Sequence, residues 1–103
     1  MTARIAIPTD GIAAFCERWQ VTELALFGSV LRDDFGPDSD IDVLVSFEEA
    51  ARHTLLDMAR MEGELKTLFG REVDLAERAG IETSRNYIRR KAILQSAETI
   101  YAA

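Results

Sequence analysis

The chain has 103 residues, of which 48% are hydrophobic and 29% charged, a composition typical of a folded domain, so we expect a single domain over residues 1–103. The formal net charge of −6 argues against direct nucleic-acid binding, which needs a cationic face. A single cysteine excludes an internal disulfide, and residues 1–10 lack the apolar core of a signal peptide, so we expect a cytoplasmic protein without a membrane partner.

The first part of the chain alternates between helical and strand-like patterns. Thr9 or Asp10 can cap a helix whose apolar residues recur at helical spacing. These residues are Ile12, Phe15, Cys16 and Trp19. Residues 22–28 then predict a short strand that ends in glycine, and residues 29–32 a short helical turn. Residues 35–40 read FGPDSD and predict a turn, with proline at its second position and aspartate at its third.

The central segment predicts one strand and one long helix. Residues 40–47 are rich in β-branched and apolar side chains, which favours a strand. Apolar residues recur at helical spacing over residues 53–69, and Gly70 suits the end of that helix. His53, the only histidine, is expected on the surface at the start of this helix.

The last third of the chain continues the alternation. Residues 71–77 predict a third short strand, residues 84–97 an amphipathic helix with Ser84 as its cap, and residues 98–102 a closing edge strand. Helices that alternate with strands in this way predict an α/β fold with a small sheet flanked by helices.

Two aspartates open the strand predicted over residues 40–47. Side chains alternate between the faces of a strand, so Asp40 and Asp42 share one face with Cα atoms about 6.6 Å apart, while Ile41 and Val43 point into a core. Two such carboxylates repel unless a cation lies between them. Oxygen ligands alone favour Mg²⁺ or Mn²⁺ over zinc. The pair therefore predicts a metal site.

Asp74 supplies a third acid if the strands over residues 40–47 and 71–77 are neighbours. Burial of Val73 and Leu75 would turn Asp74 toward the opposite face, where the other two acids lie. Mg²⁺ usually binds few carboxylates together with substrate phosphates. Three converging acids therefore predict phosphoryl or nucleotidyl transfer with two metal ions about 3.5 to 4 Å apart.

A Gly-Ser pair supplies what the acids lack. Gly28 permits close backbone approach to a ligand, and Ser29 begins a helical turn whose free N–H groups can hold phosphates. Arg32 lies one helical turn after Ser29, where its guanidinium can bind phosphate oxygens or pair with a loop acid. We expect these three residues to bind a nucleotide.

Each feature also has a structural interpretation. A lone Asp-x-Asp pair is a weak signal in an acidic chain, Gly28 can serve a turn, Ser29 can cap a helix, and Asp74 can be a solvated acid at a strand edge. The cations of the last predicted helix form either a solvated face or a contact with nucleotide phosphates or with an acidic patch on a partner. They are Arg85, Arg89, Arg90 and Lys91.

Gly28-Ser29, ten intervening residues and then Asp40, Ile41 and Asp42 reproduce a G-S-x10-D-x-D signature. With "LFGS", "DSDIDVLV", "VDL" and "IRRKAILQSAETIYAA", this makes the chain resemble the minimal nucleotidyltransferases of the DNA polymerase β-like superfamily over nearly its whole length. The resemblance implies a short mixed sheet that carries the acids, with helices packed on it.

The resemblance also implies roles for individual residues. It makes Asp40, Asp42 and Asp74 the catalytic metal ligands, and the Gly28-Ser29 pair the binder of the terminal phosphates of the nucleotide. Arg32 matches a basic position common after that pair, although an aspartate follows it where a glycine is common in the family.

Members of the family that resemble this chain are often encoded beside a HEPN protein, the two acting as antitoxin and toxin. The resemblance therefore implies a Mg²⁺-dependent enzyme that transfers AMP from ATP to a hydroxyl, expected to be a tyrosine, of a HEPN toxin with which it forms a hetero-oligomer. Two alternatives are an antitoxin that neutralises the toxin by binding alone, and nucleotidyl transfer to a small molecule.

Overall fold

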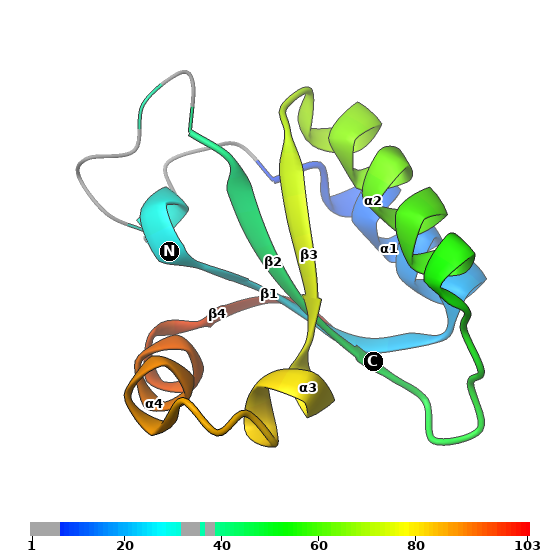
Figure 1. Cartoon of the computed structure of the whole chain (residues 1–103). Coiled ribbons are helices and arrows are strands. Elements are labelled where there is room, and N and C mark those ends of the chain that lie inside the picture. The colour runs from blue at the N-terminus through cyan, green and yellow to red at the C-terminus, as the bar shows by residue number, and fades with distance from the viewer. Residues whose placement is uncertain (1–6, 32–35, 37–38) are drawn as a thin grey trace.

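The computed structural model describes residues 7–31, 36 and 39–103. One sheet contains four strands in the order β3-β2-β1-β4 (Figure 1). The strands are β1 (Val21–Phe27), β2 (Ile41–Phe47), β3 (Val73–Glu77) and β4 (Glu98–Ala102). β1 pairs antiparallel with β2 and with β4, whereas β2 and β3 are parallel. The mixed sheet and the closing edge strand are therefore confirmed.

Helices cover both faces of the sheet, as Figure 1 shows. α1 (Thr9–Trp19) and α2 (Leu55–Phe69) lie together on one face, and α3 (Arg78–Glu82) and α4 (Tyr87–Ser96) lie on the other. A 3-10 helix, η1 (Gly28–Leu31), follows β1 directly. Among the described residues, no helix has both the length and the apolar character needed to cross a membrane. The expected α/β architecture with flanking helices is confirmed.

The larger core lies between the sheet and the pair α1 and α2. The alternation of strand side chains sends every second apolar residue to this face. Its fully buried members include Phe15, Leu24, Leu26, Ile41, Val43, Val45, Met61 and Leu65. Burial in this core explains why apolar residues recur at helical spacing in α1 and why apolar residues flank Asp42 in β2.

A smaller core lies on the opposite face, under α3 and α4. It contains Ala25, Phe27, Leu44, Ile81 and Ile93. Because Leu44 and Asp42 are two residues apart on β2, they share this face. Asp74 shares it in the same way with Ala76 on β3. The acids therefore lie on the sheet face that α3 and α4 cover in part.

The predicted cap of α1 is wrong, and α2 begins two residues later than predicted because of a local capping box. α1 begins at Thr9 without a side-chain cap, so neither Thr9 nor Asp10 caps it. α2 begins at Leu55, and Thr54 and Asp57 form a reciprocal capping box at its start. The box satisfies backbone N–H groups that a helix start leaves without partners.

His53 lies before α2 and is largely buried, so its expected surface position is wrong. Its side chain is only 12% exposed. Its Nε2 atom lies 2.8 Å from the carbonyl oxygen of Trp19, and its ring packs against Trp19 and Phe47 at centroid distances of 5.8 and 4.6 Å. The imidazole therefore joins the end of α1 to the end of β2.

The last third of the chain also differs from its prediction. Residues Arg78–Glu82 form α3, a helix that the sequence patterns did not predict. α4 begins at Tyr87 rather than near residue 84, because the Asn86 side chain, and not Ser84, accepts a hydrogen bond from the backbone N–H of Arg89 at 3.0 Å.

Candidate functional site

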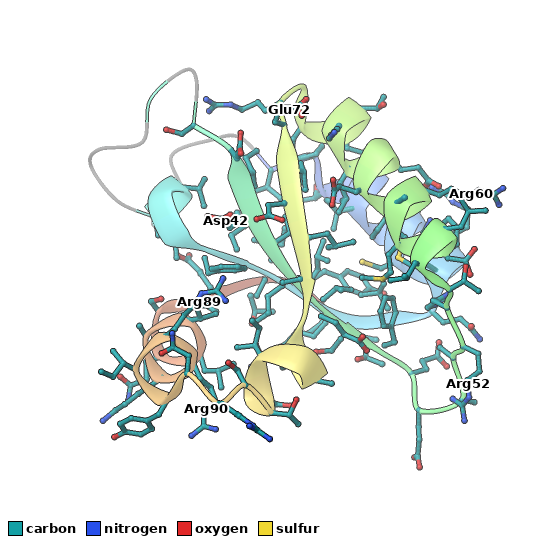
Figure 2. All side chains as sticks on the ribbon, in the orientation of Figure 1. Asp42, Arg52, Arg60, Glu72, Arg89 and Arg90 are labelled. Carbon is teal, nitrogen blue, oxygen red and sulfur yellow. The ribbon has the colours of Figure 1, made fainter. Side chains whose placement is uncertain are left out.

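Asp42 of β2 and Asp74 of β3 are register partners in the parallel pair. Neighbouring strands lie about 4.8 Å apart, and partners in register point to the same face, so the two carboxylates leave the sheet next to each other. Asp42 is half-buried and Asp74 is exposed. Figure 2 shows Asp42 on β2 near η1. The condition on which the role of Asp74 depended, that β2 and β3 are neighbours, is therefore met.

Gly28 lies against the Asp42 carboxylate. It follows Phe27, the antiparallel partner of Asp42, and adopts φ of +75°. A Cβ atom at this position would lie 2.3 Å from Oδ2 of Asp42 and 3.2 Å from its Cγ. Glycine is therefore needed here for two reasons, because L side chains disfavour positive φ and because the carboxylate occupies the space.

The other predicted site residues flank this pair. Asp40 directly precedes β2 and is exposed. Ser29 is the second residue of η1, so the expected helical turn after Gly28 is present as a 3-10 helix. Arg32 lies outside the described residues.

A turn precedes the aspartates of β2. The Ser39 backbone N–H donates to the Gly36 carbonyl at 3.1 Å, and the Gly36 N–H donates to the Ser39 hydroxyl at 3.0 Å. The predicted turn is present, although its two central residues lie outside the described part. The Arg71 guanidinium also donates to the Gly36 carbonyl. Arg71 thus ties this turn to the start of β3, a contact that no pattern in the sequence indicates.

The donor atoms of Asp42 and Asp74 suit a hard divalent cation. They are carboxylate oxygens, which Mg²⁺ and Mn²⁺ prefer. Within residues 7–31, 36 and 39–103, no group of three or more acidic, histidine or cysteine side chains has the arrangement of a metal site. The structure pairs Asp42 with Asp74, and ligation by Asp40 as well stays a prediction.

A hollow of about 550 Å³ lies at the other end of β2, near Phe47 and Met58. The side-chain nitrogen atoms of Arg52 and His53, which line this hollow, already contact backbone carbonyls. Arg52 donates to the carbonyls of Glu49 and Ala51, both at 2.9 Å, and His53 contacts the Trp19 carbonyl. We therefore assign the candidate site to the paired acids and not to this hollow.

Comparison with known proteins gives a family match over most of the chain. Residues 11–95 match the model of the family described as "Nucleotidyltransferase domain". The protein adenylyltransferase MntA of Thermococcus cleftensis is 39% identical over 67 residues, which are 65% of this chain and 66% of the relative. The chain spans only 57% to 66% of the length of the curated relatives that it matches.

Solved structures share the fold. One is described as a minimal nucleotidyltransferase and is 35% identical to this chain, with a TM-score of 0.65. The match covers 86% of this chain and 85% of the other chain. Two toxin–antitoxin complexes are only 15% identical and so support the fold alone. One, with AMP-PNP, has a TM-score of 0.68 over 92% of this chain and 73% of its own. The other, a tri-AMPylated Shewanella oneidensis HEPN toxin with an MNT antitoxin, has a TM-score of 0.62 over 93% and 71%.

Proposed function

This chain belongs to the nucleotidyltransferase domain family, whose model it matches over residues 11–95, and we propose that it transfers AMP from ATP to a hydroxyl of a partner protein. One observation carries the proposal: Asp42 and Asp74 are register partners on one sheet face, and Gly28 packs against the Asp42 carboxylate. This arrangement places paired oxygen ligands beside a backbone turn that can approach phosphates.

Each site residue has a distinct role in this proposal. Asp42 and Asp74, together with Asp40, hold divalent cations, with Mg²⁺ as the proposed metal. When bound, two such ions stabilise the negative charge of the phosphates and activate the attacking hydroxyl. Gly28 and Ser29 bring backbone N–H groups to the terminal phosphates, and the guanidinium of Arg32 is proposed as a further phosphate ligand.

The proposed acceptor is a tyrosine of a HEPN toxin, for which the chain acts as antitoxin. A relative named protein adenylyltransferase supports a protein as the acceptor. The choice of a HEPN toxin follows the family resemblance, and the descriptions of two fold neighbours as toxin–antitoxin complexes are consistent with it. Asp74 is exposed, so a hydroxyl that a partner presents can reach the acids without a change in the core. We place the reaction in the cytoplasm, within a hetero-oligomer of the two proteins.

A second candidate function is neutralisation of the toxin by binding alone. The observation that favours it is that no three acids form a metal-binding group among the residues described. The two candidates differ in whether the partner changes covalently, so a mass measurement separates them.

The test is incubation of the chain, co-purified with its HEPN partner, with ATP and Mg²⁺, followed by the intact mass of the partner. We expect the mass to increase by whole AMP groups, and to stay unchanged with excess chelator or with Asp74→Asn. Replacement of the modified tyrosine by phenylalanine identifies the acceptor. An unmodified partner in a stable, inactive complex overturns the transferase and supports neutralisation by binding.

A further inference from the structure

The residues that precede β4 carry a concentration of positive charge in an acidic chain. Residues 84–97 contain four cations and no acid, although the whole chain has a net charge of −6. These four cations are Arg85, Arg89, Arg90 and Lys91. The four differ in their contacts and in their position relative to α4, and only Arg89 is both exposed and on the side of the helix near the acids.

Arg90 has a structural role. Its guanidinium donates to the carbonyl of Ser84 at 3.2 Å and lies 5.8 Å from the centre of the Tyr87 ring. Arg85 precedes the Asn86 cap and lies outside the helix. Arg85, Arg89 and Lys91 are exposed, and among the described residues none of them has a salt-bridge partner within 4 Å.

Helix geometry separates Arg89 from Lys91. Ile93 is the buried residue of α4 and packs with Phe27 and Leu44. Four residues before it, Arg89 lies about 40° away around the helix, on the same stripe, whereas Lys91 lies about 160° away. Arg89 therefore lies next to the side of α4 that packs on the sheet, with an exposed side chain, whereas Lys91 lies near the opposite side of the helix.

The side of α4 that carries Arg89 and Ile93 lies near the paired acids. Phe27 directly precedes Gly28 and is the register partner of Asp42, and Leu44 lies two residues beyond Asp42 on the same face. In Figure 2, Arg89 lies on the side of α4 that faces Asp42 and η1. The backbone of Arg89 is held in place by the Asn86 cap at 3.0 Å.

Charge at the proposed site gives this arginine a function. Three carboxylates and a nucleoside triphosphate carry more negative charge than two divalent cations balance. An additional cation on the facing helix would bind phosphate oxygens that the metal ions leave unbalanced. Its planar guanidinium can bind two oxygens at once.

We propose that Arg89 of α4 binds the second or third phosphate of the nucleoside triphosphate, which AMP lacks, on the sheet face that carries Asp42 and Asp74. This inference rests on the proposed function, because it uses the same nucleotide site. It assigns to α4 a binding role in addition to its packing on β1 and β2.

Calorimetry with ATP and with AMP, both with Mg²⁺, tests the inference on wild type, Arg89→Ala and Arg89→Lys. We expect Arg89→Ala to weaken ATP binding about tenfold, or about 1.4 kcal/mol, and to leave AMP binding unchanged. Arg89→Lys keeps the charge without the forked geometry, so we expect an intermediate affinity for ATP.

The matched control is Arg85→Ala, which removes another exposed cation, four residues before Arg89 and directly before the Asn86 cap. It should bind ATP as wild type does, because Arg85 lies outside α4. Thermal melting checks that every variant is folded. Equal ATP affinity of wild type and Arg89→Ala overturns the inference and leaves the proposed function intact. Failure of wild type to bind ATP overturns the proposed function, and the role of Arg89 with it.

Discussion

Asp42 and Asp74 lie opposite each other on parallel neighbouring strands, and both belong to the sheet face that α3 and α4 cover only in part. Apolar residues, Leu44 and Ala76, follow the two aspartates on the same face, so the pair places two acids at the end of an apolar surface. Like charges at register positions destabilise a sheet. We interpret the pair as a feature kept for function at a cost in stability.

The first prediction concerns this cost. Asp74→Asn should raise the free energy of unfolding by less than about 1 kcal/mol without metal, because it removes one of two facing charges. The gain should shrink as salt is added, since Asp74 is exposed. Chemical denaturation at low and high salt measures it. The same variant should lose AMP transfer while it still binds the partner.

Glu77→Gln is the matched control for that variant. Glu77 lies on the same strand and is also exposed, but its register partner is Val45, which carries no charge. Its stability should therefore depend less on salt than that of Asp74→Asn. An equal response of both variants would mean that general surface charge, and not the pair, causes the effect.

The second prediction concerns Gly28. Gly28→Ala and Gly70→Ala should both cost about 1 to 2 kcal/mol, because both positions have positive φ, +75° and +69°. Only Gly28→Ala should abolish transfer. Its Cβ would lie 2.3 Å from Oδ2 of Asp42 and force that carboxylate to rotate, whereas nothing lies within 4 Å of a Cβ at Gly70.

Denaturant titration and a transfer assay on the two alanine variants separate the two effects. Gly70→Ala controls for backbone strain without a clash. If Gly28→Ala transfers AMP as fast as Gly70→Ala, the position of the Asp42 carboxylate does not matter for the reaction, and the site proposed around it is wrong.

Strand alternation explains why the shared sheet face of Asp42 and Asp74 could be predicted from sequence. Burial of Ile41 and Val43 turns Asp42 to the other face, and burial of Val73 does the same for Asp74. The only further requirement was that β2 and β3 be neighbours, which the structure confirms. Local patterns were enough for these two residues because buried or partly buried apolar side chains flank each aspartate.

Other features depend on contacts that are distant in sequence and could not be predicted locally. The His53 side chain is largely covered because Trp19 and Phe47, from two other elements, pack against its ring. The Arg71 contact with Gly36 joins segments 35 residues apart. α3 is a helix of only five residues, too short to show a period. The position of Arg89 relative to the acids depends on the packing of α4 near Phe27, which no local pattern indicates.

The third prediction concerns the start of α2. The backbone N–H of Thr54, which donates to Asp57 Oδ2 at 3.0 Å, is the main cause that lowers the pKa of Asp57 below 3.8. A lowered folded pKa adds stability above the unfolded value, and this stability is lost as pH falls through the folded value. Wild type should therefore melt higher than Asp57→Asn at pH 7, and this difference should shrink as pH falls below 3.8 and vanish only below the lowered pKa of the folded protein.

Thermal melting from neutral to acidic pH measures the difference, with Asp10→Asn as control. Asp10 lies in the first turn of α1, where no capping box forms. Its melting difference from wild type should be smaller. A pH-independent difference for Asp57→Asn would contradict the capping role of the carboxylate.

The fourth prediction concerns Cys16. Burial in the core raises the pKa of its thiol from 9.0 to about 12. The thiol stays protonated in the folded protein, so an alkylating reagent at pH 8 should modify it only after denaturation. Stability should fall as pH rises above 9, where the unfolded thiol ionises, and this part of the fall should be absent in Cys16→Ala. Mass spectrometry and melting curves test both statements.

The last prediction separates an enzyme from an antitoxin that acts only by binding. Asp40→Asn combined with Asp42→Asn should abolish modification of the partner, because amides replace carboxylate ligands, while the buried residues that form the fold are unchanged. Co-purification should show that the complex survives, and intact mass should show an unmodified partner. In cells at native expression, the double variant should fail to protect against the toxin. Full protection by a variant that transfers no AMP would show that binding, and not transfer, neutralises the toxin.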